Sequence, residues 1–325
     1  MKHLDLISIG DTQHDVFLEL EEEIKILDDR KTKMKYLGLV YAEKIPVKKF
    51  TSVLAVGNSA NVAIGSSRLG LKTAFYTVLG SDIIGKEELA VFQKEKVFPD
   101  YIVWDKQHGS NFSAVLNYRA ERTILVHHER RTYVLPQLAP AKYIYMSSMG
   151  LGFEKIHTSL IRYIKKHDVN MGFNPGSFQM KAGLKKLAPI VRSSTVFFVN
   201  REEAETLLKK RGEIKQLLRS LRLLGPKIVV ITDGPKGSYS FDGSQFLFLP
   251  IFPARVVERT GTGDAYSTGF LTGLAHGKSV KEAMRWGTIN SASVLEHIGA
   301  REGLLTKKEL ELKLKLHINF QPKKI

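Results

Sequence analysis

The 325-residue sequence contains no cysteine, which excludes disulfides, zinc–thiolate sites and a thiol nucleophile. Its ten histidines show no metal-ligand spacing. No apolar run approaches the ~20 residues that a membrane-spanning helix needs, and the short apolar stretch at the start contains Asp5. We therefore expect a cytoplasmic protein without a membrane partner.

The chain has fewer acidic residues (33 Asp and Glu) than basic ones (49 Lys and Arg), which gives a formal net charge of +16 and a pI near 9.7. A nucleic-acid-binding stripe would produce such a balance. Here, however, the basic residues are spread over several segments with the spacing of amphipathic helices and are not interleaved with aromatics. This spacing favours solvated helix faces, so we do not expect a nucleic-acid partner. An anionic substrate would benefit from the same field.

Hydrophobic periodicity predicts an α/β protein. Short apolar segments over 4–9 and 16–20 indicate an opening β-hairpin. Helical and strand patterns then alternate. The expected elements are helix 59–69, strand 73–79, helix 86–96, strand 143–147, helix 153–167, strand 169–173, helix 181–191, strand 195–199, helices 201–210 and 213–224, strand 227–232 and a hairpin over 238–248. This order predicts a mostly parallel sheet with helices on both faces and a ligand at the carboxyl ends of its strands.

Residues 101–135 break this order because they alternate apolar and polar positions without a helix, as antiparallel strands do. We expect this segment and residues 12–50 to form a small β-stranded lid on one domain that spans 1–325. Two copies of the chain could pair through such a lid as a homodimer.

The segment Glu258–Ala265 reads ERTGTGDA and leads into a helix. Small residues before a helix let backbone N–H groups converge on one anion, which the helix dipole also favours. Asp264 would place a carboxylate beside that anion, where it could accept a proton from an attacking hydroxyl. An aspartate that merely caps the helix explains the segment equally well.

Together with two earlier motifs, this segment resembles the signatures of the ribokinase-like carbohydrate kinases, or PfkB family. Thr260, Gly261, Gly263 and Asp264 match the family's Asp-Thr-Thr-Gly-Ala-Gly-Asp pattern. The earlier motifs are GNSANVA over 57–63 with RLG over 68–70, and LGSDIIG over 79–85. The resemblance implies a ribokinase-like fold and an ATP-dependent kinase that phosphorylates a hydroxyl of a small sugar.

The same resemblance implies a role for each matching residue. Asp264 would be the general base, and Gly261, Thr262 and Gly263 would form the anion hole. The implied nucleotide contacts are Asn200, Thr232, Gly234, Gly237 and Asn290. Glu203 and Asn200 would hold Mg²⁺ largely through water, which suits a hard cation that keeps much of its hydration shell. The implied acceptor contacts are Asp11, Gln13, Asp15, Gly57, Asn58 and Asn61.

The sequence leaves several alternatives open. Helix-capping and turn roles account physically for Asn58, Asp11 and Asp15. Glu258-Arg259 replaces the family's Asp-Thr near a loop that binds a monovalent cation in several members, so cation dependence stays open. We expect a free sugar rather than a phosphosugar as acceptor.

Two other functional classes compete with a sugar kinase. A nucleoside kinase would need a stacking pocket, for which Tyr101, Trp104, Phe112 and Tyr118 are available. A non-catalytic nucleotide- or nucleic-acid-binding protein would not need Asp264, Asn200 and Glu203 together. Residues 80–87 nearly match a P-loop, but we do not expect one because Glu87 stands where Ser or Thr must reach magnesium.

Overall fold

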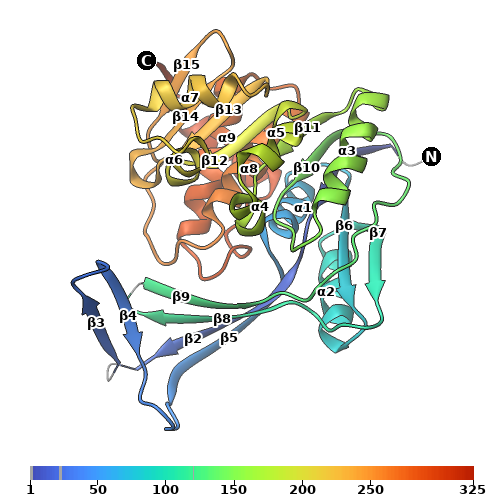
Figure 1. Ribbon diagram of the computed structural model, residues 1–325. Coiled ribbons are helices and arrows are strands. Elements are labelled where there is room, and N and C mark those ends of the chain that lie inside the picture. Colours follow the sequence, from blue (N-terminus) through green and yellow to red (C-terminus); the bar gives the residue numbers. More distant parts are fainter. Residues whose placement is uncertain (1–2, 22–23, 120) are drawn as a thin grey trace.

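The computed structural model describes residues 3–21, 24–119 and 121–325, and a ten-stranded sheet forms the centre of these residues (Figure 1). Its strands, in spatial order, are β16 (Lys323–Lys324), β15 (Phe246–Leu249), β14 (Ser238–Phe241), β13 (Ile228–Thr232), β12 (Val196–Asn200), β11 (Asn170–Phe173), β10 (Ala141–Met146), β1 (Leu4–Ile9), β6 (Thr73–Gly80) and β7 (Phe98–Asp105). The strands from β13 to β7 are parallel, and β14 to β16 extend one edge in antiparallel pairing.

Helices cover both faces of this sheet because its central strands bury side chains on both sides. Leu6 and Ile7, adjacent in β1, belong to different core clusters. The cluster around Ile7 takes apolar residues from helices that cover one face, α3 (Glu154–His167), α5 (Leu184–Arg192), α6 (Arg201–Leu208) and α7 (Ile214–Arg222). The opposite face carries α1 (Asn58–Arg68), α2 (Ile83–Lys94), α8 (Thr262–Ala275) and α9 (Val280–Leu295), with α10 (Lys307–Leu316) outside them. Among these helices, none has both the length and the apolar character needed to cross a membrane.

The predicted α/β class is confirmed, but three local expectations are wrong. The helix expected over 181–191 is two helices, α4 (Ser177–Ala182) and α5, because Gly183 between them has a φ of 80°. The opening hairpin does not form, since β1 pairs with β10 and β6 instead of with the next strand. The first strand of the segment expected to be antiparallel, β7, pairs in parallel with β6 at the edge of the large sheet.

A second sheet lies below the large one in Figure 1 and projects away from it; we call it the lid. Its strand order is β5 (Val47–Val56), β2 (Gln13–Leu20), β8 (Phe112–Tyr118) and β9 (Glu121–His127). Strands β2 and β8 are parallel, and the other pairs are antiparallel. A separate hairpin, β3 (Lys25–Asp29) and β4 (Met34–Gly38), stands at its far end.

A buried carboxyl group ties the base of the lid to the core. Glu88 of α2 is 1% exposed, and its Oε1 accepts from the backbone N–H of Ala55 at 3.3 Å and lies 3.5 Å from the Thr12 hydroxyl. The Thr12 hydroxyl also donates to Val56 O at 3.1 Å. Burial, with the nearby charge of Asp82, raises the pKa of Glu88 to about 8. The carboxyl is therefore protonated at neutral pH.

This raised pKa makes a prediction about stability. The folded chain holds a proton on Glu88 that the unfolded chain releases near its ordinary pKa of 4.5, so Glu88 stabilises the fold less and less as pH rises from about 4.5 to about 8. Glu88→Gln removes this loss. We expect the Tm of the variant relative to wild type to rise by at least about 2 °C between pH 5 and pH 8.5, measured by thermal unfolding. Glu87→Gln, on the exposed side of α2, is the control, and equal pH slopes for Glu88→Gln and wild type would contradict the prediction.

Candidate active site

Two cavities open at the carboxyl ends of the parallel strands. The first, of about 390 Å³, lies between the lid and α8, and we call it the acceptor cavity. The second, of about 420 Å³, lies between the β13–β14 turn and α9, and we call it the nucleotide cavity. Five of the described residues line both: Asn200, Thr232, Arg259, Thr262 and Gly263. The two cavities therefore meet at the start of α8.

The local backbone at the start of α8 creates an anion-binding corner. Gly261, the N-cap, has a φ of 76°, and a side chain there would collide with Ala300. The first turn leaves its N–H groups without intrahelical acceptors. A Cβ on Gly263 would meet no atom within 4 Å, so open space lies against this turn. Thr262 and Gly263 line that space in both cavities.

Asp264 follows directly and is 8% exposed. Its Oδ2 accepts from Nδ2 of Asn61, on α1, at 2.8 Å. Burial raises the pKa of Asp264 to about 6, and the charge of Glu203 adds to this rise, while the amides of Asn61 and Asn58 oppose it. A carboxyl with this pKa is ionised near neutral pH and can accept a proton.

The position of Asp264 depends on close helix packing around α8. A Cβ on Gly269 would lie 2.5 Å from Trp286 O, and one on Gly273 would lie 3.1 Å from the Cα of Ala283, both in α9. Gly269 and Gly273, four residues apart, thus let α8 pack directly against α9. A Cβ on Gly277, four residues further on, would meet no atom within 4 Å, and this glycine follows the helix end with a φ of 75°.

The other acceptor-cavity residues come from the lid and from α1. Gln13 and Asp15 lie on β2, and the Gln13 amide donates to Asp15 Oδ1 at 2.7 Å. Burial raises the pKa of Asp15 to about 6, against hydrogen bonds from Gln13 and Ser113. Gly57 and Asn58, at the start of α1, line the same cavity with Asn61. Carboxylate and amide groups thus face the cavity from two sides.

Asn200 and Glu203 form a reciprocal cap at the start of α6. Glu203 N donates to Asn200 Oδ1 at 2.8 Å, and Asn200 N donates to Glu203 Oε2 at 2.9 Å. Both residues also line the acceptor cavity. Burial raises the pKa of Glu203. The cap leaves Glu203 Oε1 without a hydrogen-bond partner among the described residues.

The nucleotide cavity has a tight turn along one wall. Thr232 ends β13, and Gly234 and Gly237 follow with φ values of 49° and 92°. The Gly237 carbonyl accepts from Asp233 N at 2.8 Å and closes the turn. All three predicted contacts of this segment therefore line the cavity.

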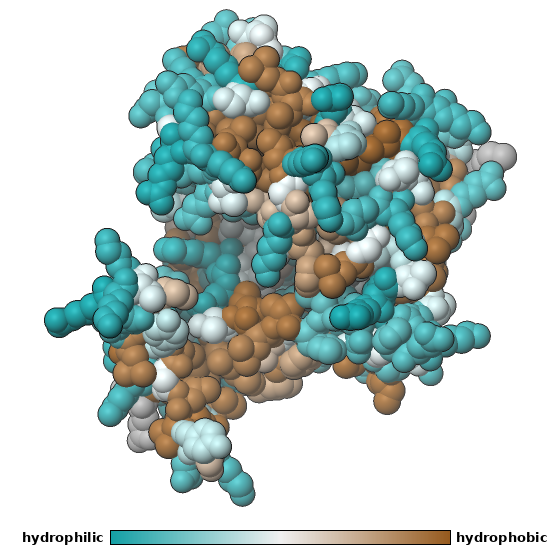
Figure 2. All heavy atoms as spheres, in the orientation of Figure 1, coloured by the Kyte–Doolittle hydropathy of each residue, from teal (hydrophilic) through white to brown (hydrophobic). Residues whose placement is uncertain are grey.

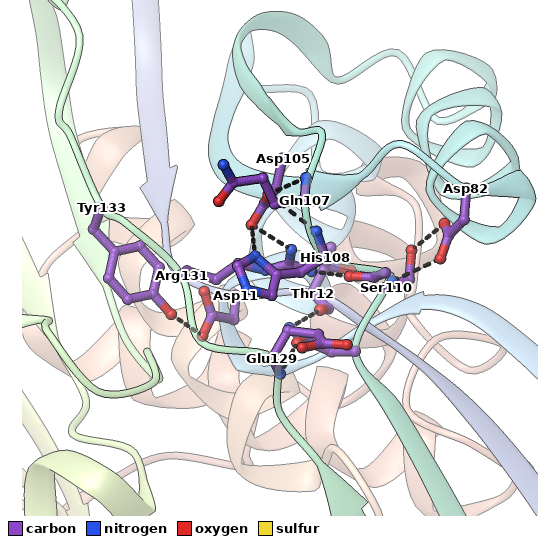
Figure 3. A network of polar contacts seen from close by, with 12 residues as sticks. Asp11, Thr12, Asp82, Asp105, Gln107, His108, Ser110, Glu129, Arg131 and Tyr133 are labelled. Atoms are coloured by element: carbon purple, nitrogen blue, oxygen red, sulfur yellow. Dashed lines mark hydrogen bonds and ion pairs between the residues drawn. The ribbon is translucent and has the colours of Figure 1, made fainter.

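Two of the predicted site residues do not line either cavity. Asp11 is 6% exposed, and its Oδ2 accepts from the Tyr133 hydroxyl at 2.7 Å and from Gly150 N at 2.8 Å. Figure 3 shows Tyr133 pointing toward Asp11, within a polar network that also holds Arg131 and its ion pair with Asp105. Asp11 thus connects the end of β1 to Tyr133, which follows the lid, and to Gly150, which follows β10.

Asn290 is also fully buried. Its Nδ2 donates to Ala265 O at 2.8 Å, and its Oδ1 accepts from Leu305 N at 3.1 Å. Both ends of its amide are thus occupied by backbone groups. Asn290 therefore holds the start of α8 against the backbone at Leu305 and does not line the nucleotide cavity.

The sequence motifs missed several cavity residues. An apolar wall of the nucleotide cavity is formed by Ile251, Phe252, Val256, Tyr266, Ala292 and Leu295. Thr288, Ser291, Ala292 and Leu295 have the i, i+3, i+4, i+7 spacing of one helix face, a signal that the sequence carried. Arg122 and Ile124 of β9 line the acceptor cavity from the lid, and only the folding of the lid reveals this.

These features define an α/β phosphotransferase in which an anion-binding helix start, a buried carboxylate and two adjoining cavities meet. The chain matches the pfkB family carbohydrate kinases over residues 31–307 and belongs to that family of ATP-dependent kinases that act on sugar hydroxyls. This confirms the resemblance drawn from the sequence motifs.

The chain is similar to several known members. An uncharacterized sugar kinase of Archaeoglobus fulgidus is 29% identical over 249 residues, which cover 74% of this chain and 98% of the relative. The structure of Arabidopsis thaliana ribokinase complexed with ribose and ATP has a TM-score of 0.78 at 20% identity, covering 97% and 99% of the two chains. The nucleoside kinase of Methanocaldococcus jannaschii has a TM-score of 0.77 at 17% identity, covering 98% and 99%. These two likenesses show the ribokinase fold.

The Asn61–Asp264 hydrogen bond makes a prediction about pH dependence. The amide stabilises the ionised carboxylate, so Asn61→Ala should raise the pKa of Asp264 further. A hydrogen bond to a charged group contributes about 1.5–3 kcal/mol, so we expect the acid limb of kcat/KM to move up by about one to two pH units. Asn174→Ala is the control, because this amide lines the same cavity but donates to Phe198 O. An acid limb that does not move in Asn61→Ala would contradict the assignment.

Proposed function

We propose that this chain transfers the γ-phosphoryl group of magnesium-bound ATP to a hydroxyl group of a small sugar, with Asp264 as general base. The observation that carries the proposal is the position of Asp264. It is buried where the two cavities meet, next to the open space at the first turn of α8. A hydroxyl in the acceptor cavity would thus lie between a base and a phosphate-binding corner.

The residues divide the reaction between them. Asp15, Asn58 and Asn61 offer hydrogen-bonding groups to the sugar hydroxyls, and a site built in this way rejects analogues that lack them. Asp264 accepts the proton of the attacking hydroxyl as the new P–O bond forms. The N–H groups of Thr262 and Gly263 stabilise the negative charge on the transferring group, and the bond to the ADP oxygen breaks.

The residues present also suit a magnesium ion. Asn200, which lines both cavities, and Glu203, which lines the acceptor cavity, would provide oxygen ligands, which a hard cation prefers. The described residues contain no cluster of three or more His, Asp or Glu side chains that could hold a metal directly. Binding through water and the substrate phosphates fits this sparse set, and the ion would neutralise phosphate charge during transfer.

A sugar fits the acceptor cavity better than a nucleoside does. None of Tyr101, Trp104, Phe112 and Tyr118 lines that cavity, and Phe198 is the one aromatic residue among the described residues that line it. Tyr101 packs into the core instead. A nucleoside base in this cavity would therefore have none of these four aromatic side chains to stack on.

A panel of acceptors tests this proposal. ADP release should require both an added sugar and magnesium, and it should stop in excess chelator. The kcat/KM for the best sugar should be at least about tenfold higher than for any nucleoside, a difference of about 1.4 kcal/mol in transition-state binding. Turnover that persists in the chelator would contradict the magnesium requirement. A nucleoside as the best acceptor in the panel would contradict the sugar assignment.

A variant of the proposed base tests the role of Asp264. Asp264→Asn should lower kcat at least ~10²-fold while ADP affinity stays within about threefold, since loss of a general base costs 10²–10⁴ in rate.

We also propose that two copies of the chain associate through the outer face of the lid. By strand pairing, Phe50, Phe112 and Leu125 share the face opposite Asp15, and they are 61%, 37% and 57% exposed. Figure 2 shows apolar side chains gathered along the lid in the lower part of the molecule. An exposed apolar patch of this kind is typical of a protein–protein interaction site.

Light scattering measures this association. The wild-type chain should have about twice the 36.6 kDa mass of one copy, and Phe50→Glu should reduce it to one copy because it places a charge in the interface. Leu223→Glu, an equally drastic change at an 86% exposed leucine away from the lid, should leave the mass unchanged. A wild-type mass of one copy would refute the proposal.

A further inference from the structure

Arg259 occupies a position that the motif comparison did not mark as functional. It is one of the five described residues that line both cavities and the only one of them with a charged side chain. The other four had each been singled out from the sequence as phosphate, nucleotide or metal contacts. A permanent positive charge thus stands where the nucleotide and the acceptor must meet.

The backbone around Arg259 is fixed, while its side chain is free. Arg259 O accepts from the Thr262 hydroxyl at 3.1 Å. The preceding Glu258 carboxylate accepts from Thr260 N at 2.8 Å, from Gly299 N at 3.2 Å and from Arg122 of the lid at 3.3 Å. The exposed guanidinium of Arg259 makes no hydrogen bond or ion pair with any described residue. Its donors therefore remain available to a ligand.

The charge balance of the junction favours such a ligand. The carboxylates of the buried Asp264 and the half-buried Glu203 lie beside the anion-binding corner, and an ionised Asp264 repels the incoming phosphoryl group. A guanidinium offers planar, paired donors that match phosphate oxygens, and it cannot lose its charge. Arg259 would offset this repulsion where charge spreads over the transferring oxygens.

We propose that Arg259 donates hydrogen bonds to the γ-phosphoryl group during transfer and is a catalytic residue. The inference rests on the proposed function. The bond between the γ-phosphorus and the ADP oxygen breaks, a bond to the acceptor oxygen forms, and the acceptor proton passes to Asp264. Arg259 exchanges no atoms and contributes charge stabilisation alone.

The test compares Arg259→Gln and Arg259→Lys with Arg255→Gln, an exposed arginine of the same loop that lines neither cavity. Arg259→Gln should lower kcat by about 10²-fold or more, the loss typical of a donor to transition-state charge, while ADP affinity and Tm stay unchanged. Arg259→Lys should restore only part of the rate, because a lysine keeps the charge without the paired donors. Arg255→Gln should match wild type.

Two further readouts separate this role from a structural one. Guanidinium ions at millimolar concentration should raise the rate of Arg259→Ala and leave that of Arg255→Ala unchanged. Arg259→Gln should also bind ADP with aluminium fluoride, which mimics the transferring group, at least about tenfold more weakly than wild type does. A kcat within threefold of wild type, or an equal loss of ADP affinity, would overturn the proposal. A wild-type chain that is inactive with every acceptor would instead refute the proposed function, and the aluminium fluoride affinities would still decide the role of Arg259.

Discussion

The close approach of α8 to its neighbours is the constraint on which the rest of the site depends. A Cβ on Gly65 of α1 would lie 2.7 Å from the Thr268 side chain of α8, and Gly269 brings α8 equally close to α9. Because Gly65 leaves room for the Thr268 side chain, α1 and α8 pack closely and their N-terminal ends reach the same point. There Asn61 meets Asp264, and the positive ends of both helices surround one buried carboxylate.

This arrangement brings several carboxyl groups and several positively charged groups into one small volume. Asp264, Asp15 and Glu203 all have raised pKa values because burial disfavours their ionised forms. Burying such carboxyl groups lowers the folding stability, but it also provides a base that can accept a proton near neutral pH. The unpaired N–H groups of α8 and the guanidinium of Arg259 supply the compensating positive charge. During transfer, the phosphoryl group would therefore lie between the negative carboxylate of Asp264 and the positive groups formed by the α8 N–H groups and Arg259.

The motif residues were predictable because their constraints are local. A phosphate-binding turn needs glycine at Gly261, whose φ of 76° no larger residue adopts easily, and this requirement is visible in the sequence. The same holds for the turn at Gly234 and Gly237. Asp11 and Asn290 matched the family by position, but their partners are distant in sequence, 122 residues away for Tyr133 and 25 for Ala265. Nothing local identified these distant groups as the hydrogen-bond partners of the two side chains.

The sequence by itself determined the α/β class, the order of most helices and strands, and the phosphate-binding chemistry at the start of α8, because periodicity, glycine spacing and helix starts act over a few residues. Tertiary structure decided which strands belong to which sheet. Strand β2 leaves β1 and pairs with β8, about a hundred residues further on, because its apolar side chains complete the core of the lid. It also decided that Arg122 and Arg259 face the cavities, since a cavity is a property of surfaces brought together from distant segments.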